Sequence, residues 1–174
     1  MPAAPQLSTD RLLAFSAVFL SLAALVVSIF QTAILREQQR ASVWPRLQVD
    51  RNAIDSNYLL TLTNGGVGPA LIRAYGLRHA GADFAQAGEL SREVIRDLGS
   101  YDSLGAFGWY YADVERGEVI RAGQEIELLR SVGSPRLRDA LDSVFDPASA
   151  VLTIRYADVY GNEWTLRNGV VEER

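Results

Sequence analysis

One long apolar stretch constrains this chain more than any other feature of its sequence. Residues 12–35 read LLAFSAVFLSLAALVVSIFQTAIL and contain no charged side chain. At about 1.5 Å of rise per residue, a helix of this length crosses a hydrocarbon core of about 30 Å. We therefore predict a single transmembrane helix over residues 12–35, preceded by a tail of residues 1–11.

A cleaved signal peptide also places an apolar run near an N-terminus. Here the residues before the run are weakly basic, with Arg11 offset by Asp10, and the run is longer than a usual signal-peptide core. No cleavage site of small residues precedes the polar segment ILREQQR. The sequence favours an uncleaved anchor.

The charges on either side of the apolar run predict its orientation. Arg36, Arg40 and Arg46 follow it against Glu37, whereas Arg11 precedes it. The positive-inside rule therefore predicts that the C-terminal domain lies in the cytoplasm. Arg36 and Arg40 are four residues apart on a continuing helix, so they either contact lipid headgroups from one face or form an ordinary flank of an anchor.

The rest of the chain has the length of one soluble domain. The chain has 174 residues and a formal net charge of −4, and all 17 of its basic residues are arginine. A net negative charge argues against nucleic acid as the main partner, because binding to phosphates requires a clustered basic face. The sequence contains no cysteine, which excludes disulfides, thiolate metal sites and cysteine nucleophiles.

Alternation of apolar and polar residues predicts a mainly β domain. Pro45 ends a helical spacer and linker of residues 36–45, the domain follows over residues 46–168, and residues 169–174 are expected to be a frayed tail. Helical spacing predicts short helices over residues 89–98 and 134–144. Many short strands without strand–helix alternation favour an immunoglobulin-like antiparallel β-sandwich. The predicted strands cover residues 47–50 and 58–63 with a polar turn at 52–57 between them, then 70–78, part of the aromatic segment 100–117, 118–120, 125–129, 150–156 and 163–167.

The segment Asn64-Gly65-Gly66-Val67-Gly68-Pro69-Ala70 is the most specific local sequence. Its glycines permit positive φ or close backbone approach, and its proline lacks an N–H donor, so it suits a bent crossing between two strands. A phosphate-binding loop requires a helix directly after the glycines, or Gly-Lys-Ser/Thr, and neither is present. We interpret it as a structural loop formed by Asn64, Gly65, Gly66, Gly68 and Pro69.

Three blocks of sequence resemble a group of small, mostly uncharacterised bacterial membrane-anchored proteins. They are ASVWP at residues 41–45, LTNGGVGPALI at 62–72 with an N-x-G-x-G-P-A motif, and IRYADVYGN at 154–162. The resemblance implies an anchor and a compact β-sandwich, and with the charge pattern it implies the bacterial inner (cytoplasmic) membrane. It supplies no catalytic residues.

The sequence contains no catalytic constellation that we recognise. His79 is the single histidine, and no G-x-S-x-G motif is present. Asp158, Asn162 and Glu163 at the last predicted turn do not have EF-hand spacing, and turns collect such residues for backbone reasons. We therefore expect a protein that is not an enzyme and that holds no metal and no cofactor.

Two functions remain open from the sequence. One is an accessory or assembly subunit of a larger integral-membrane complex, and the other is a free-standing anchored module that binds a soluble protein or small ligand. Small residues three or four apart in the anchor favour the first, because they let another helix approach closely, although they also suit ordinary anchor composition. Adjacent aromatics fit either sheet packing or an exposed docking patch. The small residues are Ala17, Ser21, Ala24 and Ser28, and the aromatics are Trp109, Tyr110 and Tyr111.

Overall fold

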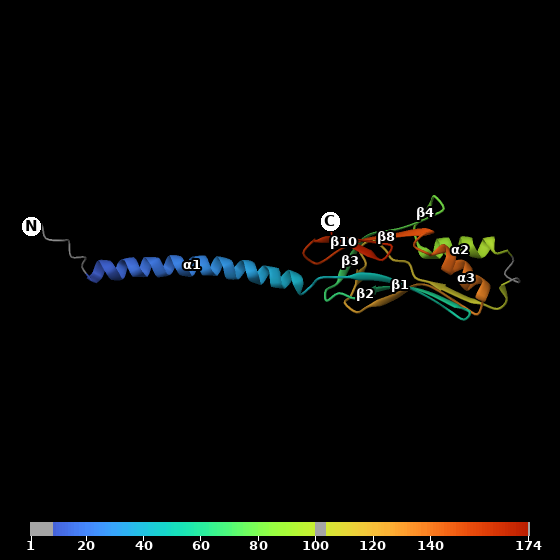
Figure 1. Cartoon of the computed structure of the whole chain (residues 1–174), viewed down its shortest axis with the longest axis horizontal. Helices are drawn as coiled ribbons and strands as arrows, with labels where there is room; N and C mark the ends of the chain where they lie inside the picture. The colour runs from blue at the N-terminus through green and yellow to red at the C-terminus, as the bar shows by residue number, and fades with distance from the viewer. Residues whose placement is uncertain (1–8, 100–103, 174) are drawn as a thin grey trace, which may run out of the picture. The chain divides into compact units, whose positions relative to one another are not determined.

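The structure, a computed structural model, describes residues 9–99 and 104–173 (Figure 1). It consists of two compact units, Met1–Ala41 and Ser42–Arg174.

The first unit is the helix α1 (Thr9–Ala41). Its segment Thr9–Gln39 is long and apolar enough to cross a membrane. The hydroxyl groups of Ser16, Ser21 and Thr32 donate to backbone carbonyl groups within the helix, Ser21 Oγ to the Ala17 carbonyl at 2.8 Å, so these three need no partner from lipid. The predicted helix of residues 12–35 is thus part of a longer one. Residues 9–11 of the predicted tail are helical, and residues 1–8 lie outside the described residues.

The described part of the second unit forms ten strands and two helices. One antiparallel sheet has the order β1-β2-β7-β5 and the other β10-β9-β8-β3-β4, with β6 paired to the start of β3. This arrangement confirms the predicted fold class, a mainly β chain with an N-terminal apolar helix and an immunoglobulin-like sandwich. The elements are β1 (Leu47–Ile54), β2 (Asn57–Asn64), β3 (Ala70–His79), β4 (Ala82–Phe84), α2 (Ala87–Asp97), β5 (Gly108–Tyr111), β6 (Val119–Ile120), β7 (Glu125–Val132), α3 (Pro135–Val144), β8 (Ala150–Ala157), β9 (Glu163–Arg167) and β10 (Val170–Glu173).

The core lies between the two sheets and beneath the two helices. Alternate residues of β2, β3, β8 and β9 point inward and are fully buried, including Leu62, Ile72, Ile154 and Leu166. The helices α2 and α3 lie together at one end of the domain (Figure 1) and add the buried side chains of Leu90, Ile95, Leu137 and Leu141. Burial also raises the pKa of the Tyr58 phenol above its usual value, because the charged form would lose its hydration.

Two predicted boundaries were wrong. Residues 169–174 were expected to be a tail, but β10 pairs with β9 across a turn at Asn168 and Gly169, both of which have positive φ. The predicted domain limit of residue 168 is therefore too early. The turn between β1 and β2 is also shorter than the predicted residues 52–57. Ile54 pairs with Asn57, because Asp55 takes a φ of +53° and closes the hairpin in two residues.

The buried side chain of Asn64 joins three segments of the domain. Its Oδ1 accepts hydrogen bonds from the N–H groups of Arg46 at 3.1 Å and Gly66 at 3.0 Å. Its Nδ2 donates to the carbonyl groups of Gly68 at 2.8 Å and Ile120 at 3.0 Å. The amide thereby uses both of its donor hydrogens and both of its acceptor sites. It ties the segment before β1 to the loop after β2 and to β6.

Gly66 and Gly68 let this loop lie directly against the segment that leads into β1. A Cβ on Gly68 would overlap the carbonyl group of Val43, and one on Gly66 would come within 2.5 Å of the Trp44 carbonyl oxygen. Neither glycine has a positive φ. Close backbone approach is therefore the reason for glycine at both positions. Pro69, which has no N–H to donate, is the last residue before β3.

A methyl group at Gly68 must displace the backbone of Val43. We expect Gly68→Ala to lower the free energy of unfolding of the domain by about 1–3 kcal/mol. Denaturation of the full chain in detergent micelles, followed by tryptophan fluorescence, measures this change. Gly76→Ala is the matched control, because a Cβ there meets no atom within 4 Å, and it should leave stability unchanged or slightly higher. Equal stability of the two variants would contradict the close-approach explanation.

Candidate binding surface

Strand β5 forms one edge of its sheet and carries three adjacent aromatic residues. It pairs with β7, where Tyr110 lies opposite Arg130 and Tyr111 opposite Leu129. In the described residues no strand pairs with its other edge. A free edge presents backbone N–H and C=O groups that can accept an added strand.

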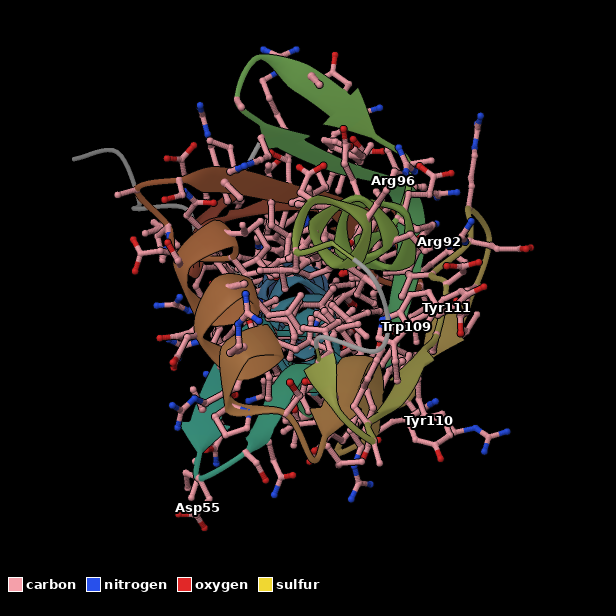
Figure 2. The ribbon with its side chains drawn as sticks, turned by 90° about the vertical axis from the view of Figure 1, so that its right-hand side faces the viewer. Asp55, Arg92, Arg96, Trp109, Tyr110 and Tyr111 are labelled. Carbon is pink, nitrogen blue, oxygen red and sulfur yellow. The ribbon has the colours of Figure 1, made fainter. Side chains whose placement is uncertain are left out.

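The three aromatic side chains of β5 divide between its two sides (Figure 2). Trp109 and Tyr111 lie on the side next to α2, with ring centroids 5.0 Å apart, and Trp109 Nε1 donates to Ser91 Oγ at 3.1 Å. Tyr110 lies on the opposite side and is 63% exposed. Trp109 therefore packs against the core, as sheet packing predicts, whereas Tyr110 is exposed to solvent.

Helix α2 holds the Tyr111 ring in place. The Arg92 guanidinium lies 5.2 Å from the ring centroid, and its Nη2 donates to the Tyr111 hydroxyl at 3.3 Å. Gly88 allows the ring to approach the helix, because a Cβ there would come within 2.5 Å of a ring carbon. Arg96, one turn after Arg92, is also exposed (Figure 2). We call Arg92, Arg96, Trp109, Tyr110 and Tyr111 the β5 surface.

The β5 surface has the composition of a protein-binding site. Tryptophan, tyrosine and arginine dominate the binding energy of characterised interfaces. Within the described residues neither Arg92 nor Arg96 forms an ion pair, so both can pair with carboxylates of a partner. The sequence did not single out these arginines. Their spacing of four on a predicted helix was visible, but their contact with β5 depends on tertiary packing.

The other predicted site residues lie elsewhere. The small residues Ala17, Ser21, Ala24 and Ser28 share one face of α1 and are exposed within that unit. Arg36 is exposed on the same helix, and the side chain of Arg40 lies outside the described part of the chain. In the glycine-rich loop, Asn64, Gly65, Gly66 and Gly68 contact the segment before β1, and Pro69 leads into β3.

Two of the polar residues considered for catalysis or metal binding, His79 and Asp158, have hydrogen-bonding partners within the domain. His79 Nδ1 lies 3.0 Å from the Ser149 carbonyl oxygen. The Asp158 carboxylate accepts hydrogen bonds from the N–H groups of Tyr160 at 2.8 Å and Asn162 at 2.9 Å, so it caps its own turn. In the part of the chain that the structure describes, no group of three or more acidic or histidine side chains is placed to hold a metal ion.

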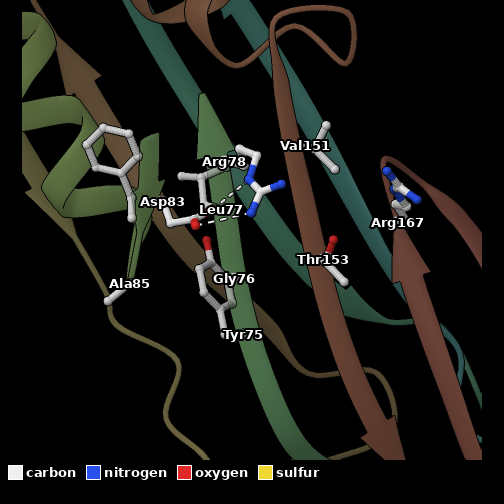
Figure 3. A pocket seen from close by; sticks show the side chains of 10 residues that line it. Tyr75, Gly76, Leu77, Arg78, Asp83, Ala85, Val151, Thr153 and Arg167 are labelled. Carbon is white, nitrogen blue, oxygen red and sulfur yellow. Dashed lines mark hydrogen bonds and ion pairs between the residues drawn. The ribbon is translucent and has the colours of Figure 1, made fainter. Parts of the chain in front are cut away.

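An open hollow of about 500 Å³ lies on the outer face of the β3 sheet (Figure 3). It lies over Gly76, between Thr153 and Arg167 on one side and an Arg78–Asp83 pair on the other. Arg78 Nε donates to Asp83 Oδ1 at 2.7 Å, and this hydrogen bond lowers the pKa of Asp83 below its usual value. Both side chains are exposed, so the pair contributes little to stability.

Comparisons with models of protein families, with curated proteins and with solved structures found no match.

Proposed function

We propose that this chain is a non-catalytic single-pass membrane protein whose sandwich domain binds another protein through the β5 surface. The observation that carries this proposal is the arrangement of Arg92, Trp109 and Tyr111. Their mutual contacts order the aromatic side chains before a partner arrives, which reduces the entropy lost on binding. The free edge of β5 adds backbone groups that a partner strand can bond.

The proposed partner is an extended or strand-forming segment with acidic side chains. Such a segment adds to the free edge of β5 and contacts Tyr110, which projects from the side of the strand away from α2. Its carboxylates pair with Arg92 and Arg96, which lie on the adjacent helix.

A photo-crosslinker tests this surface directly. We expect p-benzoylphenylalanine at position 110 of the full chain, in its native membrane, to form an adduct with one protein. Arg92→Glu should lower the adduct yield several-fold, because it removes the contact with Tyr111 and reverses the charge. The same crosslinker at position 54 is the control, since Ile54 is 58% exposed at the turn between β1 and β2. No adduct at position 110, or the same adduct from both positions, would contradict the proposal.

A second candidate function is an accessory or assembly subunit of a larger integral-membrane complex. It is supported by the exposed small-residue face of α1, formed by Ala17, Ser21, Ala24 and Ser28. The Ser21 hydroxyl donates to the Ala17 carbonyl at 2.8 Å, so this side chain lies close to the helix backbone and its hydrogen bond is satisfied within the helix. Such a face suits close packing with another transmembrane helix.

Enlarging the small-residue face should break such a complex. We expect the double variant Ser21→Leu and Ala24→Leu to lose a stoichiometric integral-membrane partner after mild detergent extraction, affinity purification and mass spectrometry. Val26→Leu enlarges a residue on the opposite face of α1 and should retain the partner. Recovery of the same partner from both variants, or of soluble partners alone, would rule out this second function.

We further propose that the protein lies in a bacterial inner membrane with its domain in the cytoplasm. The support is the charge pattern, in which Arg36, Arg40 and Arg46 follow the apolar run and Arg11 precedes it. A C-terminal fusion to green fluorescent protein should therefore be fluorescent, and a fusion to alkaline phosphatase should be inactive. Active phosphatase with a dark fluorescent fusion would reverse the orientation.

A further inference from the structure

Four exposed apolar or aromatic side chains occupy loops of the sandwich. Trp44 is 40% exposed, Val67 65%, Val159 63% and Tyr160 53%. Large exposed apolar side chains are ordinary when scattered, but a group at one end of a domain marks a contact surface. We call these four residues the apolar tip.

Strand pairing places the four residues at the same end of the domain. Val67 lies beside Trp44, because its N–H donates to the Trp44 carbonyl at 3.0 Å. The turn that bears Val159 and Tyr160 follows Ala157, and Ala157 pairs with Leu71. Leu71 is near the start of β3, and the loop that bears Val67 lies directly before this strand. The helices α2 and α3 lie at the opposite end of the domain (Figure 1).

Hydrogen bonds hold both loops of the apolar tip in fixed conformations. The Val67 loop is bonded to Asn64 and to the segment before β1. The second turn is held by the Asp158 carboxylate, and Gly161 takes a φ of +88° that completes it. Val67, Val159 and Tyr160 thus stay exposed although the surrounding backbone is well bonded.

The apolar tip begins three residues after the last residue of α1, Ala41. Three extended residues span about 10 Å at most, and the six helical residues 36–41 after the apolar run add about 9 Å, so Trp44 lies within about 19 Å of the end of that run. If α1 crosses a bilayer, Trp44 is within reach of the lipid surface. Tryptophan and tyrosine are enriched at that surface because they present an apolar ring and a polar group together.

Charged groups around the tip are mixed in sign. Arg46 lies 5.9 Å from the Trp44 ring, and Arg121 is exposed in the turn before β7. Glu125 and Glu173 lie at the same end of the domain. Asp158 and Glu163 flank the turn that bears Val159 and Tyr160, so this end of the domain has no basic excess. We therefore expect attachment to the membrane to depend on apolar contact, and uncharged phosphatidylcholine is the lipid that tests it.

We propose that the apolar tip inserts into the headgroup layer of the membrane that α1 crosses, so that the domain sits on the lipid. This inference rests on the anchor role of α1 in the proposed function. The apolar tip is a different surface from the β5 surface, and the proposal is that lipid covers the end of the domain that bears the tip.

Single cysteine variants of the full chain test the inference, because the sequence contains no native cysteine. Val67→Cys and Val159→Cys are each labelled with the fluorophore NBD and reconstituted in phosphatidylcholine nanodiscs. Some discs carry a nitroxide on the headgroup and others carry it deep in the acyl chain. We expect at least twofold quenching of both labels by the headgroup nitroxide, with a blue-shifted emission.

Two further labels are the controls. Ile54→Cys, 58% exposed at the other end of the domain, should show no quenching. Leu25→Cys in α1 should be quenched by the deep nitroxide if the helix is inserted. Adding Val67→Asp to the Val159→Cys protein should reduce quenching at position 159, because one half of the tip can no longer enter the lipid.

The outcomes distinguish failure of the apolar-tip proposal from failure of the proposed anchor role of α1. Quenching at position 25 without quenching at 67 and 159 overturns the proposed insertion of the apolar tip but leaves the anchor role of α1 supported. A blue shift at 67 and 159 without quenching means that protein, such as a second copy of this chain, covers the tip, and also overturns it. No quenching at position 25 overturns the anchor role of α1 and the tip together.

Discussion

Four hydrogen bonds to one buried amide hold this domain together where the chain enters it. A buried amide without partners costs several kcal/mol, roughly 2–7, so the fold is constrained to bring partners to Asn64 from three segments. The glycines at 66 and 68 remove the side chains that would keep those segments apart. As a result the domain is already ordered at Trp44, three residues after α1. A polar requirement therefore decides where along the chain the domain begins.

Features with local causes were predictable from the sequence. The apolar run of α1 and the alternating strands β2 and β8 carry their own periodic signals. The start of α3 was also visible, because Ser134 caps the helix by accepting a hydrogen bond from the Leu137 N–H at 3.4 Å, directly before Pro135. Gly99 ends α2 with a φ of +98°, as a glycine at that position suggests. In each case the determining residues are within a few positions of the structure that they cause.

Features with distant causes were missed or left open. Strand β10 gives no alternating signal, because Val170 is exposed and no residue of the strand is fully buried, so only its pairing with β9 reveals it. The sequence does not distinguish positive φ from close backbone approach as the reason for glycine in the loop, because the contact between Gly68 and Val43 is formed by tertiary structure. The contact between Arg92 and Tyr111 joins residues 19 positions apart on different elements. The aromatic residues of the candidate site were thus visible in the sequence, whereas their arrangement with Arg92 and Arg96 was not, since packing brings these side chains together.

The two proposed surfaces lie toward opposite ends of one sandwich, and this separation bears on the choice between the two functions. Strand β7 runs eight residues, about 26 Å at ~3.3 Å per residue, and β5 pairs with its last four. If the apolar tip lies on the lipid as proposed, the length of β7 would place the β5 surface on the order of 20 Å from the headgroups. At that height the surface is accessible both to a soluble protein and to the extramembrane part of an integral-membrane protein. Under the two proposals, the small-residue face of α1 and the β5 surface would then contact the same partner, the first within the bilayer and the second outside it. In that case the accessory subunit and the binding module would be one assembly with two contacts. Binding of a partner to α1 would raise its effective concentration at the β5 surface, which favours the second contact.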